Sequence, residues 1–239
     1  MSVRAIVFDA YGTLYDVQSV LALTTELCGD KGEAVTQIWR LKQLEYSWLH
    51  GLIGDYEDFW SITRSSLNFA LKSVGVEPTL SLCERLMNKY LDLAPYPEAH
   101  AALSSLTQCK RAILSNGSTH MLSTLVHASG IATLLDAVIS VDLARTYKPN
   151  PACYALVEQT LGIPKADVLF VSSNGFDVAG AKHFGFKVAW IQRAGPPTSQ
   201  SDPRLGPSQL FRALRGRAEE FGQQPDYRVS SLTDVVSLL

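Results

Sequence analysis

The sequence predicts an α/β fold, with a parallel sheet as its core and a helical cap inserted after the first strand. Short apolar runs alternate with helical patterns from residue 111 onward, which is typical of parallel strands joined by crossover helices. Residues 16–94 instead indicate helices without a convincing strand, and Pro95-Tyr96-Pro97 then breaks the pattern. A chain of 239 residues has room for one such domain and a small insert.

The division into domains follows from this pattern. We expect an α/β core domain made of residues 1–15 and 96–239, and a helical cap domain made of residues 16–95. The run Ala5-Ile6-Val7-Phe8 predicts a first, buried strand. Further strands are expected at 111–115, 137–140, 168–172, 187–191 and 227–229.

Helices are expected between these strands. One should begin at Ser118 or Thr119 and stop at Gly130, and others should cover 151–161 and about 177–185. A short helix should close the chain. The four prolines of residues 195–209 suggest a loop, and a charged helix is expected over about 208–220. We interpret this insert as a solvated surface excursion.

Composition excludes several classes of function. With 46% hydrophobic and 18% charged residues the chain is an ordinary globular protein, and its net charge of −2 argues against nucleic acid or an anionic membrane as partner. The four cysteines are scattered without a CxxC pair, which indicates neither zinc nor a redox motif. No apolar run reaches the roughly 18 residues that a membrane span needs. Free thiols and no signal peptide predict a soluble, cytoplasmic protein.

Polar side chains follow the predicted strands where each one ends. Asp9 follows the first strand, Ser115 and Asn116 the second, Lys148 the third and Asp177 the fourth. The carboxyl ends of parallel strands meet at one edge of the sheet, where open α/β sheets bind ligands. We therefore expect these side chains to share a site beneath the cap.

The turn after the first strand carries its own chemistry. Gly12 lets the loop bend so that its amides face an anion. Thr13 is expected to hold one carboxylate oxygen of Asp9 and leave the other free to attack. Alone, this pattern also fits an aspartate that caps a strand and turn in any α/β protein.

Together these segments resemble the motifs of the haloacid dehalogenase superfamily, and of its L-2-haloacid dehalogenase (type II haloalkanoic acid dehalogenase) branch in particular. The resemblance implies a Rossmann-like core with an inserted helical cap. Tyr11 stands where the phosphatases of the superfamily carry a second Asp, the acid for the leaving group. Ser172, Ser173 and Asn174 stand where magnesium-dependent members usually have acidic residues. The implied reaction therefore uses neither a metal nor another cofactor.

The resemblance also implies a role for each site residue. Asp9 would be a covalent nucleophile, and Lys148 would neutralise it and help to bind the substrate carboxylate. The implied catalytic residues are Asp9, Thr13, Arg40, Ser115, Lys148, Tyr154, Ser172, Asn174 and Asp177. The implied substrate-binding residues are Tyr11, Leu44, Phe59, Ser115, Asn116, Lys148 and Phe176, with Arg40 and Asn116 as halide acceptors.

Several of these residues have plainer interpretations from pattern alone. Arg40 shares a helix face with Thr36, Gln43 and Ser47, and an arginine on such a polar stripe is ordinarily solvated. A lysine before a proline, such as Lys148, is usually exposed. Asp177 could be a helix N-cap and Ser115 part of a capping loop. The remaining positions could be a half-buried helical tyrosine (Tyr154) or ordinary core (Tyr11, Leu44, Phe59, Phe176).

The expected activity is hydrolytic dehalogenation of short L-2-haloalkanoic acids to (R)-2-hydroxy acids, with inversion at C2 through an Asp9 ester. Alternatives are a magnesium-dependent small-molecule phosphatase of the same superfamily and a non-catalytic binding protein. Leu41 and Phe176 stand where the family has Gln and Trp, which changes the pocket wall rather than the chemistry. The five histidines show no metal-ligand spacing, and we expect none to be the base. Family resemblance also implies a homodimer.

Overall fold

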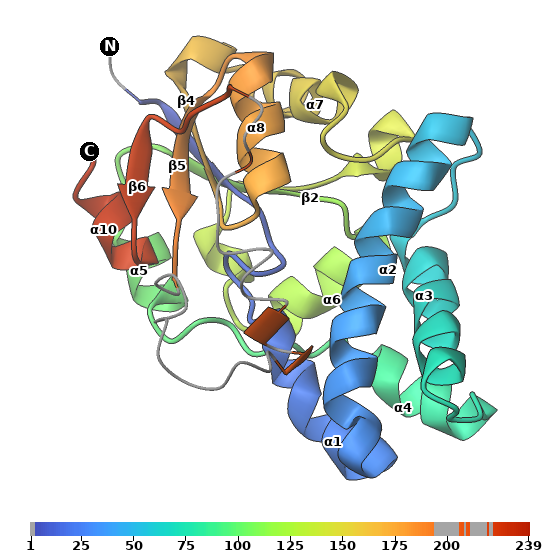
Figure 1. The fold of residues 1–239 in the computed structure, drawn as a ribbon. Helices are drawn as coiled ribbons and strands as arrows, with labels where there is room; N and C mark the ends of the chain where they lie inside the picture. Colours follow the sequence, from blue (N-terminus) through green and yellow to red (C-terminus); the bar gives the residue numbers. More distant parts are fainter. Residues whose placement is uncertain (1–2, 194–205, 208, 211–218, 220–221) are drawn as a thin grey trace.

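The fold is built on one six-stranded sheet in which every pair of neighbouring strands is parallel. The computed structural model describes residues 3–193, 206–207, 209–210, 219 and 222–239. The strand order is β3-β2-β1-β4-β5-β6. The strands are β1 (Ala5–Phe8), β2 (Lys110–Ser115), β3 (Ala137–Ser140), β4 (Val168–Ser172), β5 (Lys187–Ile191) and β6 (Tyr227–Val229) (Figure 1). The predicted α/β class is confirmed, and only the start of β2 differs, by one residue.

The centre of the sheet is where the strand order changes direction. β1 pairs with β2 on one side and with β4 on the other. Every residue of β1 and β4 is buried, as expected for strands covered by helices on both faces. Ligands of open α/β sheets bind beyond the carboxyl ends of strands at such a switch point. Asp9 and residues 173–174 therefore follow the two strands that define it.

Helices pack on both faces of the sheet (Figure 1). Caps mark several starts: Ser118 accepts the amide of Met121, and Asn150 caps a helix that opens with Pro151. The helices are α5 (Ala99–Ser105), α6 (Thr119–Ala128), α7 (Pro151–Leu161), α8 (Gly175–Phe184) and α10 (Leu232–Val236). The prediction missed α5 and started α8 two residues late. Short 3-10 turns lie at Ala132–Leu134, Val141–Ala144 and Lys165–Asp167.

A separate group of helices lies between β1 and β2 in the chain, in the place predicted for the cap. We call it the helical unit; it comprises α1 (Leu21–Cys28), α2 (Gly32–Ile53), α3 (Phe59–Ser73) and α4 (Leu80–Lys89), with 3-10 turns at Val17–Val20 and Gly29–Lys31. It stands to one side of the sheet (Figure 1). The two chain crossings that join it to the sheet pair with each other, because Asp16 N donates to Ala94 O and Tyr96 N to Leu14 O, both at 2.9 Å.

Aromatic side chains continue the sheet core into the helical unit. The ring of Tyr11 lies 6.0 Å from Phe59 and 6.2 Å from Tyr90, and Tyr90 lies 4.7 Å from Trp39. All four residues are buried in one hydrophobic cluster with β1 and β4. The helical unit is thus packed onto the end of the sheet that carries Asp9. The predicted loop and charged helix of residues 195–220 lie mostly outside the described residues.

Candidate active site

Asp9 follows β1 and is held on both carboxylate oxygens. Oδ1 accepts a hydrogen bond from Nζ of Lys148 at 3.2 Å, and Oδ2 accepts one from Nδ2 of Asn174 at 2.7 Å. The residue is only 6% exposed. An ionised carboxylate in such surroundings is stabilised by a cation and an amide donor rather than by water.

Thr13 does not hold Asp9, so this expectation was wrong. Its Oγ1 accepts from the amide of Ser173 at 3.0 Å and contacts Ser173 Oγ at 3.4 Å. Ser173 Oγ also donates to Gly12 O at 2.8 Å. Gly12 has φ +89°, and a Cβ there would lie 3.0 Å from Ser173 Oγ. Thr13 and Ser173 therefore bind the turn after β1 to the turn after β4, and this places Asp9 beside Asn174.

Lys148 is a buried cation between two carboxylates, which removes the plainer interpretation of an exposed lysine. Nζ donates to Leu114 O at 2.7 Å, to Asp177 Oδ2 at 2.9 Å and to Asp9 Oδ1 at 3.2 Å. These bonds use all three donors of an ammonium group. Burial lowers the pKa of Lys148, but the charges of Asp177 and Asp9 outweigh it and raise the pKa overall. A substrate carboxylate that bonds to Nζ must replace one of these partners.

Asp177 lies in the first turn of α8 and faces Lys148 instead of capping the helix. Its Oδ1 accepts from Oη of Tyr154 at 2.8 Å. Burial and the nearby charge of Asp9 raise the pKa of Asp177, Lys148 and Tyr154 lower it, and the net result is a pKa of about 6. Tyr154 itself is fully buried, which removes its half-buried interpretation. Asp177 therefore links Tyr154 on α7 to Lys148 and, through it, to Asp9.

The serines at the ends of β2 and β4 are completely buried. Ser115 Oγ accepts from Gly117 N and Ser172 Oγ from Asn174 N, both at 3.1 Å, so each shapes its turn and keeps a hydroxyl proton to donate. Asn116 accepts the amide of Lys148 on its side-chain oxygen at 3.0 Å. That bond leaves the NH2 group of Asn116 as its free donor end.

Arg40 enters the site from α2 and is not solvated. It is 5% exposed, and Nη1 donates to Oε1 of Gln43 at 2.6 Å. No carboxylate of the described residues lies within ion-pair distance of it, although Lys148 has two. A buried guanidinium without an anionic partner is costly, so the site favours an anion beside it.

The predicted residues converge on one small cavity of about 10 Å³, which has room for about one water molecule. Thr13, Tyr154 and Ser172 do not line it and stand behind the residues that do. Its lining residues are Asp9, Tyr11, Arg40, Leu44, Phe59, Ser115, Asn116, Lys148, Asn174, Phe176 and Asp177. A neighbouring cavity of about 140 Å³ shares Tyr11, Arg40 and Asn174 with it.

Pattern reasoning missed several groups that complete the site. In the sequence, Gln43 appears only as a member of the polar stripe of Arg40, and Ser173 only as a residue that is not acidic. Trp48 packs edge-on against Phe176 with ring centres 5.2 Å apart. The carbonyl of Leu114 could not be found from residue identity, because every residue has one. Gln43 could have been found by asking what satisfies a buried arginine.

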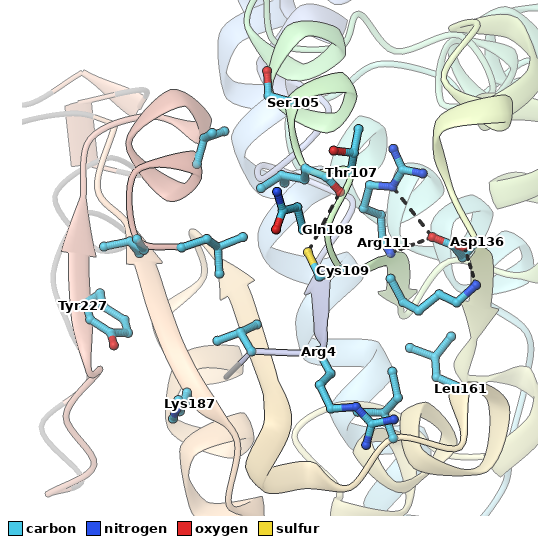
Figure 2. Close-up of a pocket in the computed structure, with 17 residues that line it drawn as sticks. Arg4, Ser105, Thr107, Gln108, Cys109, Arg111, Asp136, Leu161, Lys187 and Tyr227 are labelled. Carbon is cyan, nitrogen blue, oxygen red and sulfur yellow. Dashed lines mark hydrogen bonds and ion pairs between the residues drawn. The ribbon is translucent and has the colours of Figure 1, made fainter. Parts of the chain in front are cut away.

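A wider cavity lies at the opposite edge of the sheet and is lined by none of the predicted site residues. It measures about 970 Å³ and is lined by Arg4, Cys109, Lys187 and Tyr227, among others (Figure 2). Lys110 and Arg111 pair there with Asp136. Lys110 and Arg111 are therefore neutralised locally, and the residues that line this cavity include no arrangement of nucleophile and base.

Known proteins match this chain over its whole described core. Residues 3–185 match the haloacid dehalogenase-like hydrolases. The chain belongs to this family. A (S)-2-haloacid dehalogenase of Xanthobacter autotrophicus is 48% identical over 99% of this chain and 95% of its own length. Haloacetate dehalogenase H-2 of Moraxella sp. (strain B) is 40% identical over 99% of this chain and 98% of its own.

A solved structure extends the match to the fold. The L-2-haloacid dehalogenase from Xanthobacter autotrophicus with chloropropionic acid covalently bound has a TM-score of 0.94 and 48% identity, covering 99% of this chain and 98% of that one. Within the residues that the structure describes, no group of three His, Cys, Asp or Glu side chains could hold a metal ion. Among the same residues, no helix has the length and apolar character needed to cross a membrane.

Proposed function

We propose that this family member is an (S)-2-haloacid dehalogenase, which hydrolyses short L-2-haloalkanoic acids to (R)-2-hydroxy acids and halide. The observation that carries the proposal is the pairing of Asp9 with Lys148 and Asn174 in a small cavity that is also lined by Arg40, a cation with no carboxylate partner among the described residues. An anionic nucleophile faces a site for an anionic leaving group. The relatives named above, including one with a covalently bound chloropropionic acid, support the same reaction.

The first step forms an ester. Ser115, Lys148 and loop amides hold the substrate carboxylate, and an oxygen of Asp9 attacks C2 opposite the halogen. The new O–C2 bond forms as the C2–halogen bond breaks, and the halide takes the bonding electrons. Arg40 and the NH2 of Asn116 stabilise the growing negative charge. Attack at a tetrahedral carbon from the rear inverts C2.

The second step returns the enzyme. Water attacks the carboxyl carbon of Asp9, and the bond between this carbon and the oxygen on C2 breaks. One proton of the water ends on the departing oxygen and the other is released as Asp9 regains its carboxylate, so the hydroxy acid leaves with C2 untouched. Asp177, Ser172 and Asn174 position this water. Tyr11, Leu44, Phe59 and Phe176 form the apolar wall around C2, and exclusion of water makes Asp9 a better nucleophile.

A phosphatase would need other groups at this site. Tyr11 replaces the general acid, and burial raises its pKa well above the usual range, so its phenol is a poor proton donor. Lys148 lies between Asp9 and Asp177 and supplies the positive charge that a phosphatase takes from magnesium. We therefore propose a reaction without metal or other cofactor.

Halide release from L-2-chloropropionate in the presence of EDTA tests the proposal. We expect chloride and the D-hydroxy acid in equal amounts. Release only from phosphate esters, and only with magnesium, would replace the proposal with the phosphatase. Binding of haloacids without release of halide would indicate a binding protein.

The domain organisation and the cellular state are part of the same proposal. Residues 16–95 act as a cap on the core domain of residues 1–15 and 96–239, supported by the paired crossings at 14–16 and 94–96. A homodimer is supported by the exposed side chains of Leu52 and Ile53, 82% and 69% exposed, at the end of α2. Four free cysteines support a cytoplasmic location. Light scattering of the purified protein tests the dimer.

A further inference from the structure

Arg40 is held by a chain of buried polar groups that crosses the helical unit. Its Nη1 donates to Oε1 of Gln43 at 2.6 Å, and Nε2 of Gln43 donates to Oγ1 of Thr63 on α3 at 2.7 Å. Thr63 Oγ1 donates in turn to the carbonyl oxygen of Phe59 at 2.6 Å. Gln43 and Thr63 are completely buried and neither lines the cavity. They reach the cavity through residues that line it, Arg40 at one end and Phe59 at the other.

The direction of this series of hydrogen bonds is fixed by Thr63. A threonine hydroxyl has one proton, and Thr63 gives it to Phe59 O, so toward Gln43 it can only accept. Gln43 must then turn its NH2 to Thr63 and its oxygen to Arg40. If the amide of Gln43 were reversed, its NH2 group would face the donors of Arg40. Its oxygen would face the hydroxyl of Thr63, whose only proton is already donated to Phe59 O. A backbone carbonyl of α3 thus determines how the arginine is held.

The hydrogen bond to Gln43 holds Arg40 without neutralising its charge. Gln43 is an uncharged acceptor, and no carboxylate of the described residues pairs with the guanidinium. A guanidinium carries five N–H donors, and the bond to Gln43 uses one. The others and the whole positive charge stay available to an anion in the cavity that Arg40 lines with Asp9 and Asn116. A glutamate at position 43 would accept the same bond but cancel the charge.

We propose that Gln43 and Thr63 are positioning residues that keep Arg40 oriented and uncompensated for the halide leaving C2. This inference rests on the proposed function and adds two residues to it. Because Gln43 is the hydrogen-bond partner of Arg40 within the described chain, loss of either link frees the guanidinium to move. Stabilisation of the halide then falls, and a poorer leaving group suffers more than a good one.

The test compares Thr63→Val and Gln43→Glu with Thr63→Ser, which keeps the hydroxyl. Turnover of L-2-chloropropionate and L-2-bromopropionate is measured for each purified variant. We expect kcat for the chloro acid to fall about tenfold in Thr63→Val and Gln43→Glu, with a smaller loss for the bromo acid. The bromo-to-chloro ratio therefore rises. Thr63→Ser and Ser66→Ala, which removes another buried α3 hydroxyl bonded only to backbone carbonyls, should keep the wild-type ratio.

The leaving-group ratio separates positioning from damage to the fold, because partial unfolding lowers both rates equally. Bromide binding, measured as the rise in Tm on adding sodium bromide, gives a second result that needs no turnover; we expect wild type and Thr63→Ser to show it and Thr63→Val to lose it. If wild type releases halide but Thr63→Val keeps both the ratio and the Tm rise, the positioning role is wrong and the proposed function stands. If wild type releases no halide, the proposed function is wrong. If, in addition, bromide raises the Tm equally in wild type and Thr63→Val, the positioning role is wrong as well.

Discussion

Among the single residues, Asp9 is the one on which the proposed reaction depends most. Its carboxylate is held ready by Lys148 and Asn174, and an amide in its place is a far weaker nucleophile. Asp9→Asn should lower the rate of halide release by about four orders of magnitude or more with little loss of secondary structure. Circular dichroism checks the fold, and halide release checks the rate. Cys109→Ala, half-buried at the other edge of the sheet, is the control and should be fully active.

Asp177 predicts how activity depends on pH. Its pKa of about 6 lies above the ordinary 3.8, so the folded protein binds the proton more tightly than the unfolded chain does. Ionised Asp177 is needed to hold Lys148 and Tyr154, and kcat/KM should therefore fall as pH drops through about 6. The free energy of unfolding depends on pH in the opposite direction: the stabilising contribution of Asp177 is lost as pH rises between about 4 and 6.

Tyr154→Phe tests whether Asp177 causes the fall of kcat/KM at acidic pH, which we call the acidic limb. The phenol of Tyr154 donates to Asp177 and lowers the pKa of that carboxyl, so its removal should move the limb of kcat/KM to higher pH. Tyr46→Phe, at a half-buried position where α2 packs against Phe69 of α3, should leave this pH dependence unchanged. A limb that is the same in Tyr154→Phe and wild type would mean that another group titrates.

Residue identities at the strand ends predicted most of the site. Asp9, Asn116, Lys148 and Asp177 meet because parallel strands end at one edge of the sheet. The partner of Thr13 could not be predicted, because it depends on how closely the turn after β4 approaches. The burial of Lys148 and Arg40 was equally hidden, since a charged residue in a polar pattern has the same sequence signal whether water or protein surrounds it.

At the scale of elements, α7 and α8 must approach closely for Tyr154 to reach Asp177. Gly180 makes this possible: a Cβ there would lie 2.5 Å from Tyr154 Oη and 2.5 Å from Pro149 Cβ. Gly180→Ala should therefore cost about 1–3 kcal/mol of unfolding free energy, seen as a lower Tm, and weaken catalysis through Tyr154. Gly51→Ala is the matched control in α2, where the nearest atom would be 3.5 Å away. Equal Tm values for the two variants would contradict this packing.

Element boundaries were predictable wherever a cap or a breaker marks them. Asn150, Pro151 and Gly162 define α7, and its predicted bounds are correct. By contrast, α8 begins at Gly175, inside a Ser-Ser-Asn-Gly segment that looks like a turn. Helix α5 has seven residues, too few for a periodic signal to show.

At the scale of the whole molecule, the helical unit closes the site. The cavity of about 10 Å³ is smaller than a haloacid, and Arg40, Leu44 and Phe59 of the helical unit form part of its wall, so we expect the helical unit to open away from the sheet when substrate enters. Two tyrosines join it to the sheet side far from the chain crossings: Tyr56 Oη donates to Asp142, and Tyr147 Oη donates to Glu57 O. The sequence predicted a cap over the sheet but not its closure, which depends on these long-range contacts.

Removing one of these contacts should speed substrate binding. A hydrogen bond contributes about 1 kcal/mol, so Tyr56→Phe should raise the open population, and with it the association rate, about fivefold. Stopped-flow tryptophan fluorescence with Asp9→Asn as background measures this rate without turnover. Tyr46→Phe serves as control. An unchanged association rate in Tyr56→Phe would mean that substrate reaches Asp9 without this contact opening.

Formation of the Asp9 ester can be followed directly with oxygen-18 from labelled water. After many turnovers of L-2-chloropropionate, mass spectrometry of the peptide that contains Asp9 should show oxygen-18 in its carboxylate, because water attacks the carboxyl carbon. In a single turnover the hydroxy acid should carry unlabelled oxygen taken from Asp9. Label in the single-turnover product, with none in Asp9, would show that water attacks C2 directly and that no Asp9 ester forms.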